Sequence, residues 1–239
     1  MFTGIVRAIG TVESIRDRGG GRALAVELGA LIAAMDADDA PLQVGDSIAV
    51  NGACLTVAAL RDAGESESAP HDAGDVESAL RDAGDGARAT CADFDISPET
   101  LAKCLIGEWT VGQRLNLEPA LTLRTPLGGH LVPGHVDGVG EVIEIAPTDA
   151  FTRMRIAAPR ALGVLLAAKG AVAVDGVSLT VNAASDEPAS GRTRFEVMLV
   201  PHTLRATALG ALRVGARVHL EADPLARYAQ RLLDSREAK

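Results

Sequence analysis

Cys54 and Ser178 are the residues of this sequence best placed to do chemistry, because they occupy the same position in two matching segments. Residues 50–57 read Val-Asn-Gly-Ala-Cys-Leu-Thr-Val, and residues 174–181 read Val-Asp-Gly-Val-Ser-Leu-Thr-Val. In each segment a threonine follows two residues later on the same strand face, where both polar groups could hydrogen-bond a ligand. The pattern also fits a buried cysteine beside threonines that merely favour strands. A nucleophilic cysteine triad is disfavoured, since serine replaces cysteine in the second segment.

The two segments belong to an internal duplication of the chain. Three further blocks recur in the same order: residues 4–12 with 134–142, 97–101 with 200–204, and 111–118 with 214–221. The segments that begin at Val50 and Val174 lie 124 residues apart, whereas the blocks that begin at Val111 and Val214 lie 103 apart. The first half therefore carries about 21 additional residues between these blocks.

The additional residues form a low-complexity stretch over residues 61–88. The letters Asp-Ala-Gly recur every ten residues, after Arg61, His71 and Arg81. The stretch holds eight acidic and three basic residues, so five of the nine net negative charges of the chain lie here. It cannot bury enough apolar surface to offset the entropy lost on ordering. We expect a solvated, mobile hairpin loop, and the alternative is an acidic loop that docks a specific partner.

Strand and turn signals dominate both halves. Asn51-Gly52 and Asp175-Gly176 are strong hairpin signals, because both turn residues must adopt positive φ. They are flanked by predicted strands at residues 47–50, 53–60, 171–174 and 177–183. Short strands with glycine-rich turns, repeated in each half, predict an all-β chain of two small closed barrels. The boundary between them is expected near Leu123 to Gly128, where Pro and Gly break the strand pattern.

Two helices interrupt the strand pattern. Ser97-Pro98 places a capping residue before a proline and predicts a short helix through Leu105. Asp223-Pro224 predicts a helix over residues 225–238 with an apolar face. The members of that face are Leu225, Tyr228, Ala229 and Leu232. Such a helix could dock on a partner subunit or pack on its own barrel, and the sequence leaves both open.

Composition excludes several classes of function. The chain has 239 residues, 47% of them hydrophobic, with a formal net charge of −9, so it is globular and unsuited to a nucleic-acid partner. No apolar run reaches bilayer-spanning length, and the N-terminus does not read as a targeting peptide. Three cysteines without a C-x-x-C pair indicate neither a disulfide framework nor a cysteine zinc site, and favour a reducing compartment.

Standard nucleotide, zinc-protease and serine-hydrolase motifs are missing from the sequence. His130 and His135 bracket a Pro-Gly turn, but no local spacing supplies a third metal ligand. We therefore predict no metal. A structural histidine is the simple interpretation of His130, and less so of His135, which falls in a repeated block.

The repeated blocks resemble the riboflavin synthase family, whose members are built from two lumazine-binding barrels. The carriers are Met1–Val6, Asn51–Val57, Gly128–Val136, Asp175–Val181 and Pro201–Leu204. The resemblance covers nearly the whole chain except residues 61–88. It implies an enzyme of the transferase class that joins two molecules of 6,7-dimethyl-8-ribityllumazine. One donates a four-carbon unit to the other, giving riboflavin and 5-amino-6-ribitylamino-uracil, without metal or organic cofactor.

The resemblance also implies the architecture. Each half is expected to form a six-stranded Greek-key barrel, at residues 1–125 and 126–222, followed by an oligomerisation helix at 223–239. It implies a homotrimer, and the cysteine usage and composition described above add the expectation of a cytoplasmic protein with no membrane or nucleic-acid partner. The active site is expected between the N-terminal barrel of one subunit and the C-terminal barrel of its neighbour.

The residues carried over by motif form two expected pockets. The N-barrel pocket is assigned Gly4, Ile5, Val6, Cys54, Leu55, Thr56, Asp95, Ile96, Ser97, Pro98, Glu99 and Thr100. The C-barrel pocket is assigned Gly134, His135, Val136, Lys169, Ser178, Leu179, Thr180, Leu199, Val200, Pro201, His202, Thr203 and Leu204. The first half has no lysine to match Lys169, and Asp46 stands in a comparable place.

Two rings held face to face would supply most of the catalysis through proximity and orientation. We hypothesise that His135 with Ser178 or Thr180 moves protons, that Cys54 and Thr56 position the other ring, and that Phe2 packs the N-terminal strand. The base and the nucleophile stay unassigned. Alternatives are a non-catalytic lumazine or flavin antenna protein and a structural scaffold with vestigial pockets. Both halves keep their pocket blocks, which favours the enzyme.

Overall fold

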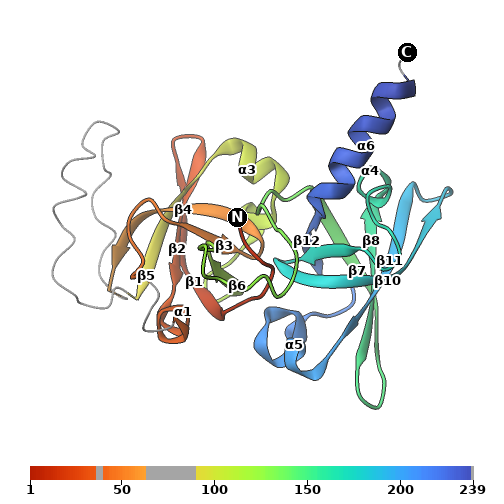
Figure 1. The fold of residues 1–239 in the computed structure, drawn as a ribbon. Helices are drawn as coiled ribbons and strands as arrows, with labels where there is room; N and C mark the ends of the chain where they lie inside the picture. Colours follow the sequence, from red (N-terminus) through yellow and green to blue (C-terminus); the bar gives the residue numbers. More distant parts are fainter. Residues whose placement is uncertain (36–39, 63–89, 238–239) are drawn as a thin grey trace.

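A computed structural model describes residues 1–35, 40–62 and 90–237 of the chain. Two closed barrels, each of six antiparallel strands, follow one another along the sequence (Figure 1). The first barrel is built from β1 Ala8–Arg18, β2 Gly21–Glu27, β3 Ser47–Val50, β4 Ala53–Arg61, β5 Cys91–Ile96 and β6 Arg114–Pro119. Its helical segments are α1 Gly29–Ala34, α3 Pro98–Lys103 and the 3-10 helix η1 Leu105–Glu108.

The second barrel repeats this plan. Its strands are β7 Gly138–Pro147, β8 Thr152–Pro159, β9 Ala171–Val174, β10 Val177–Glu187, β11 Arg192–Leu199 and β12 Arg217–Ala222. Its helical segments are α4 Arg160–Gly163, α5 Pro201–Ala206 and the 3-10 helix η2 Ala208–Ala211. Helix α6, Pro224–Glu237, follows the last strand and extends away from the barrel (Figure 1).

The strand order shows that the halves share one topology. Around the first barrel the order is β1-β2-β5-β4-β3-β6, and the second has the equivalent closed order β7-β8-β11-β10-β9-β12. In the first barrel β3, β4 and β5 are neighbours in that order, and β6 returns to lie beside β3. The strands β9, β10, β11 and β12 of the second barrel are arranged in the same way, and this arrangement is a Greek key. The predicted fold class, two tandem six-stranded barrels with a C-terminal helix, is confirmed.

Each barrel has its own apolar core, formed by the inward-facing residues of its strands. Phe94 and Leu117 are among the fully buried residues of the first core, and Phe195 and Leu220 are among those of the second. With 3% aromatic residues in the chain, both cores depend largely on Val, Leu, Ile and Ala. Two complete cores explain how each half closes on itself.

Local signals in the sequence account for the turns and helices. The turn residues Asn51, Gly52, Asp175 and Gly176 all have positive φ, between 44° and 81°. The Ser97 hydroxyl accepts a hydrogen bond from the Thr100 amide at 3.2 Å and caps α3. That helix ends at Lys103, two residues earlier than predicted, because a separate 3-10 turn begins at Leu105.

Arg61 is structured, although the sequence assigned it to the low-complexity loop. It is the last residue of β4, and its carbonyl accepts a hydrogen bond from the Thr90 amide at 3.0 Å. Its guanidinium lies between Glu13 and Asp93, which fixes it on the barrel wall. The prediction for that residue was wrong, and residues 63–89 of the stretch lie outside the described part of the chain.

The predicted apolar face of α6 is exposed. Leu225, Tyr228 and Leu232 are 73%, 70% and 65% exposed, so this face does not pack on the chain's own barrel. In the described residues, no helix is both long enough and apolar enough to span a bilayer.

Candidate active site

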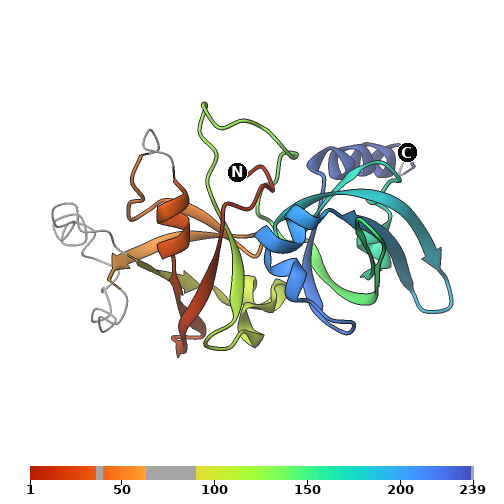
Figure 2. The same cartoon turned by 90° about the horizontal axis from the view of Figure 1, so that it is seen from below.

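Two irregular segments meet where the barrels join. We call residues 1–7 the N-strap and residues 130–137 the C-strap. The straps pair with each other through two hydrogen bonds between Phe2 and Val132, at 2.7 and 3.0 Å. Both side chains are buried, together with Ala49 and Ala173 from the two barrels. Figure 2 shows the N-terminal segment and the green connection between the barrels together at this junction.

Each strap crosses to the opposite barrel. The Gly4 carbonyl of the N-strap accepts a hydrogen bond from the Ser178 amide at 2.8 Å, on β10 of the second barrel. The Gly134 carbonyl of the C-strap accepts one from the Cys54 amide at 2.9 Å, on β4 of the first barrel. Both glycines have positive φ, and a Cβ on either would lie under 3.0 Å from the side chain it faces.

The apolar residues of the straps follow the same crossing. Val6 packs against the core of the second barrel, and Val136 packs against the core of the first. The expected grouping of Gly4 and Val6 with Cys54, and of Gly134 and Val136 with Ser178, was therefore wrong. Because the halves are duplicates, sequence alone relates each strap equally well to either barrel.

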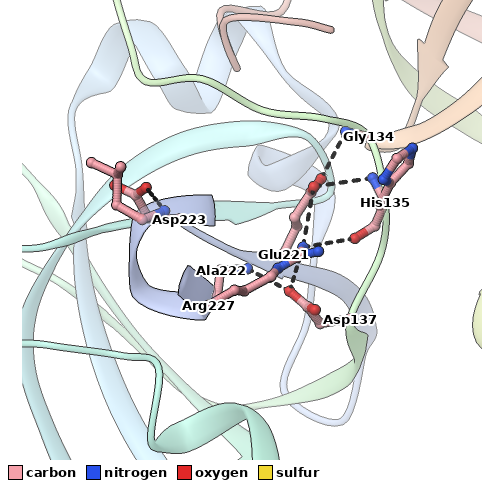
Figure 3. A network of polar contacts seen from close by, with 8 residues as sticks. Gly134, His135, Asp137, Glu221, Ala222, Asp223 and Arg227 are labelled. Carbon is pink, nitrogen blue, oxygen red and sulfur yellow. Dashed lines mark hydrogen bonds and ion pairs between the residues drawn. The ribbon is translucent and has the colours of Figure 1, made fainter. Parts of the chain in front are cut away.

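A buried carboxylate anchors each strap to its own barrel. Glu118 on β6 accepts hydrogen bonds from the Thr3 amide and hydroxyl, both at 2.7 Å, and from the Gly4 amide at 3.0 Å. Glu221 on β12 accepts hydrogen bonds from the Gly134 amide at 3.1 Å and the His135 amide at 3.0 Å (Figure 3).

Burial raises the pKa of both carboxyl groups, because it penalises the charged form. The pKa of Glu221 rises to about 7, and that of Glu118 also rises. Hydrogen bonds from the strap amides act in the opposite direction. The repeated blocks that end in Leu117-Glu118 and Leu220-Glu221 contained the signal for these residues, which the sequence prediction missed.

The Ser178 site contains a histidine that was not predicted to be catalytic. His130 Nδ1 lies 2.7 Å from Ser178 Oγ, and His130 Nε2 is buried with no partner in the described structure. Burial lowers the pKa of His130, although the Asp223 carboxylate partly opposes this. The imidazole is therefore neutral near pH 7 and can accept a proton.

Gly129 makes this contact possible. A Cβ there would lie 2.2 Å from the Thr3 carbonyl oxygen and 2.9 Å from Ser178 Oγ. His135, which was expected to act with Ser178, instead stands on the strap that contacts Cys54, and Glu221 binds its amide. The histidine beside Ser178 is His130, reached from 48 residues away along the chain.

The remaining predicted residues flank these two centres. In the first barrel Val57 pairs with Phe94, which brings residues 54–56 beside residues 95–100 at the end of β5. In the second barrel Val181 pairs with Val197, which brings residues 178–180 toward residues 199–204 at the end of β11. Among the predicted residues of these segments, Leu55, Ile96 and Leu199 are buried in the barrel cores. The exposed members are Thr56, Asp95, Ser97, Pro98, Glu99, Thr180, Val200, Pro201 and His202.

Lys169 occupies a strained position in the second barrel. Its φ is +68°, and its amide donates to the Val181 carbonyl at 2.7 Å. The equivalent amide in the first barrel is that of Gly45, which donates to Val57 and has φ +94°. Asp46, expected to match Lys169, is instead equivalent to Gly170. A lysine where the duplicate has glycine is a strained residue of the kind that clusters at functional sites.

The described residues contain no group of three or more His, Cys, Asp or Glu side chains placed to hold a metal ion. Cys54, Cys91 and Cys104 form no disulfide bond. The geometry offers two related centres, one with the Cys54 thiol and one with the Ser178–His130 pair.

Comparison with known proteins gives matches over nearly the whole chain. Residues 3–120 and 133–223 match the lumazine binding domain family. The riboflavin synthase of Photobacterium phosphoreum is 37% identical over 233 residues, covering 98% of this chain and 89% of that protein. The riboflavin synthase of Bacillus subtilis (strain 168) is 30% identical over 233 residues, covering 98% and 90%. Both sequence identities are higher than those of the two solved structures in the next paragraph, which are 21% and 20%.

Solved structures support the fold. The crystal structure of LumP complexed with riboflavin has a TM-score of 0.70 and 21% identity, covering 93% of this chain and 99% of that one. LumP complexed with 6,7-dimethyl-8-(1'-D-ribityl) lumazine has a TM-score of 0.68 and 20% identity. At this level of identity the similarity establishes a common two-barrel fold.

Proposed function

This chain belongs to the riboflavin synthase family of lumazine-binding proteins, and from this we propose that it is a transferase that dismutates 6,7-dimethyl-8-ribityllumazine. One molecule donates a four-carbon unit to a second, and the products are riboflavin and 5-amino-6-ribitylamino-uracil. The reaction needs two copies of one ligand in two related but unequal sites. That is the arrangement which the duplicated barrels provide.

The observation that carries this proposal is the difference between two otherwise equivalent centres. Each has a strap glycine bonded to a β-strand amide, at Cys54 in one barrel and Ser178 in the other. In the described residues, the Ser178 centre adds a histidine in contact with its hydroxyl, and the strand that carries Ser178 bonds the amide of Lys169, where the first barrel has Gly45. Equivalent shapes bind like molecules, and unequal polar groups give them separate roles as donor and acceptor.

The chain's own residues can supply proton transfer at the Ser178 centre. In the neutral tautomer of His130 that carries its proton on Nε2, the Ser178 hydroxyl donates to Nδ1 and can pass its proton there as its oxygen takes one from an acidic methyl group of a bound ring. We assign Cys54, Thr56 and the C-strap to holding the second ring, and Phe2 to packing the N-strap.

We also propose that the enzyme is a homotrimer in the cytoplasm. The exposed apolar side chains of α6 support assembly through this helix, since Leu225, Tyr228, Leu232 and Leu233 are each more than half exposed. Unpaired thiols suit a reducing compartment. In such a trimer the Cys54 centre of one subunit would face the Ser178 centre of its neighbour, which brings the two rings into contact.

The alternative is a non-catalytic antenna protein of the LumP type. The enzyme is favoured because the riboflavin synthases are 30% to 37% identical, whereas the LumP structures are 20% to 21% identical. The serine–histidine pair also has no necessary role in a protein that only holds a chromophore.

The test is turnover of the purified chain with the lumazine, followed by riboflavin absorbance. We expect riboflavin to form, and S178A and H130Q to reduce single-turnover rates by roughly 10²- to 10⁴-fold, the usual contribution of a positioned proton-transfer group. S190A, which changes an exposed turn serine, is the matched control and should retain the full rate. Lumazine binding without riboflavin would select the antenna, and full rates in both variants would remove the proton-transfer assignment.

A further inference from the structure

Arg227 joins helix α6 to the C-strap (Figure 3). Its Nη2 donates to the His135 carbonyl at 3.0 Å and to Asp137 Oδ2 at 2.9 Å, and lies 3.4 Å from Glu221 Oε1. Asp137 also accepts from the Ala222 amide at 2.8 Å. The strap carbonyl, the strap carboxylate and the buried carboxylate of β12 thus converge on one guanidinium.

The first barrel also has an arginine six residues after its buried carboxylate, Arg124, but it lies in a turn of the connection between the barrels, whereas Arg227 is on helix α6. Glu118 accepts from the Thr3 hydroxyl and from two strap amides, and the charge of the Met1 ammonium also lowers its pKa. The N-strap is therefore anchored to its own barrel through Glu118, in addition to its bonds to the C-strap and to Ser178. The C-strap has the same kind of carboxylate anchor, and there the cation beside the carboxylate is supplied by helix α6.

Helix α6 is otherwise weakly attached to the barrel. Among the described residues, Arg227 is the α6 side chain that makes hydrogen bonds to the strap, and the remaining side-chain bonds of the helix lie within it. The helix extends outward from the second barrel (Figure 1). The side chains of its apolar face, Leu225, Tyr228 and Leu232, are exposed. A neighbouring subunit that covers that face, as in the proposed trimer, would set the direction of the helix and therefore the position of Arg227.

We propose that Arg227 is a positioning residue that transmits the docking of α6 through Glu221 to the C-strap, and so to the site that holds Cys54 and His135. The inference rests on the proposed function and adds a coupling between assembly and one of its two sites. Arg227 acts through the strap and has no contact with the reacting rings.

The physical basis is the ionisation of Glu221. As a carboxylate it accepts from both the Gly134 and His135 amides, whereas its protonated oxygen would be a donor facing an amide donor. Burial raises the pKa of Glu221 to about 7, the strap amides and Arg227 lower it, and Asp137 raises it. Loss of Arg227 therefore raises this pKa further, and the strap loses one anchor at neutral pH.

The experiment measures kcat, KM and their pH dependence for riboflavin formation in the full chain, with R227M, R227K and R231M. Arg231 lies one turn further along the exposed surface of α6 and is the matched control for charge. We expect R227M to lower kcat roughly 10- to 100-fold through strap misplacement. We also expect the acid limb of the pH–rate profile of R227M to move up by about one pH unit. R227K should restore the acid limb but only part of kcat, because an ammonium lacks the fork geometry.

Sedimentation of each variant is measured in parallel. The proposal is supported if R227M keeps the oligomeric mass of the parent while its kcat and acid limb change. It is overturned if R227M matches R231M in both readouts, or if the rate loss is accompanied by loss of the oligomer. Failure of the parent chain to make riboflavin would instead refute the proposed function. In that case, titration of the parent and each variant with the lumazine, followed by its fluorescence, would still measure ligand binding at the two sites.

Discussion

Gly52 and Gly176 face each other across the junction of the two barrels. A Cβ on Gly52 would lie 2.7 Å from the Gly176 nitrogen, and one on Gly176 would lie 2.8 Å from the Gly52 nitrogen. These are the second residues of the two repeated hairpin turns, so the duplicated turns meet each other back to back. The close approach is between backbone atoms, which cannot rotate away as a side chain can.

The first prediction is that G176A destabilises the junction beyond the cost of its backbone angle. Gly215 has a similar φ, +88° against +78°, but an added Cβ there would meet nothing within 4 Å. G215A should therefore cost only the left-handed penalty of about 1–2 kcal/mol. G176A should cost about 1–3 kcal/mol more, the usual range for overpacking. Urea unfolding of the two variants measures the difference, and equal losses would contradict the close contact.

The second prediction concerns the crossed straps. G134A places a methyl group against Cys54, whereas G4A places one against Ser178. We expect G134A to change the rate of Cys54 alkylation several-fold and to abolish its protection by the lumazine, while G4A leaves Cys54 labelling unchanged. Labelling is followed by mass spectrometry. Cys104, whose thiol pKa burial raises to about 11, is the slow internal reference. If G4A changed the labelling of Cys54 and G134A did not, each strap would lie on its own barrel.

Local patterns in the sequence were sufficient to predict the barrels and their turns. Asn-Gly and Asp-Gly turns, period-2 strands and the Ser97 cap all act within a few residues, and all formed close to the expected positions. The repeat also identified the strap residues and the Cys54 and Ser178 positions. Duplication is the reason that two barrels could be predicted without any long-range information.

Long-range contacts were beyond the sequence. The crossing of the straps is invisible to it, because each strap is equally related to both barrels. His130 becomes a partner of Ser178 only through the fold, so it resembled a structural histidine. Arg61 begins an Arg-Asp-Ala-Gly sequence that recurs in the acidic repeats, so the sequence assigned it to the loop, although its side chain is buried on the barrel wall.

The third prediction is a loss of stability in acid caused by His219. This side chain is 1% exposed at the junction, where Nε2 accepts from the Leu105 amide at 2.6 Å and Nδ1 lies 2.8 Å from the Asn51 carbonyl. Burial lowers its pKa to about 4. The unfolded chain therefore binds more protons between about pH 6.5 and pH 4, and stability falls as the pH is lowered through this window.

H219N isolates the effect, because asparagine occupies the equivalent position in the first barrel as Asn116. The unfolding free energy of the parent minus that of H219N should fall by about 3 kcal/mol from pH 7 to pH 4. Asp175, Glu118 and Glu221, whose pKa values are raised, act in the opposite direction but cancel in this difference. Trp109, the single tryptophan, lies 5.9 Å from the His219 ring and reports the transition by fluorescence. A difference that does not vary with pH would show that His219 titrates normally.

The fourth prediction separates the low-complexity stretch from the barrel that carries it. The Arg61 side chain is 9% exposed and pairs with Glu13 and Asp93, from β1 and β5. Because its carbonyl also bonds the Thr90 amide, the β4–β5 end of the barrel is closed at Arg61. Deleting residues 63–89 while keeping Arg61 should therefore leave turnover within a few-fold of the parent.

R61M, by contrast, should destabilise the fold by about 2–4 kcal/mol, because it leaves Asp93 and the partly solvated Glu13 without their cation. R192M is the matched control, since the Arg192–Glu141 pair is about 40% exposed on both sides and should cost at most about 1 kcal/mol. Chemical unfolding and lumazine turnover are measured for the deletion variant, R61M and R192M, each against the parent. Complete loss of turnover on deletion, with unfolding unchanged, would mean that the stretch itself takes part in the reaction. A cost for R61M no larger than that for R192M would mean that Arg61 does not hold this end of the barrel closed.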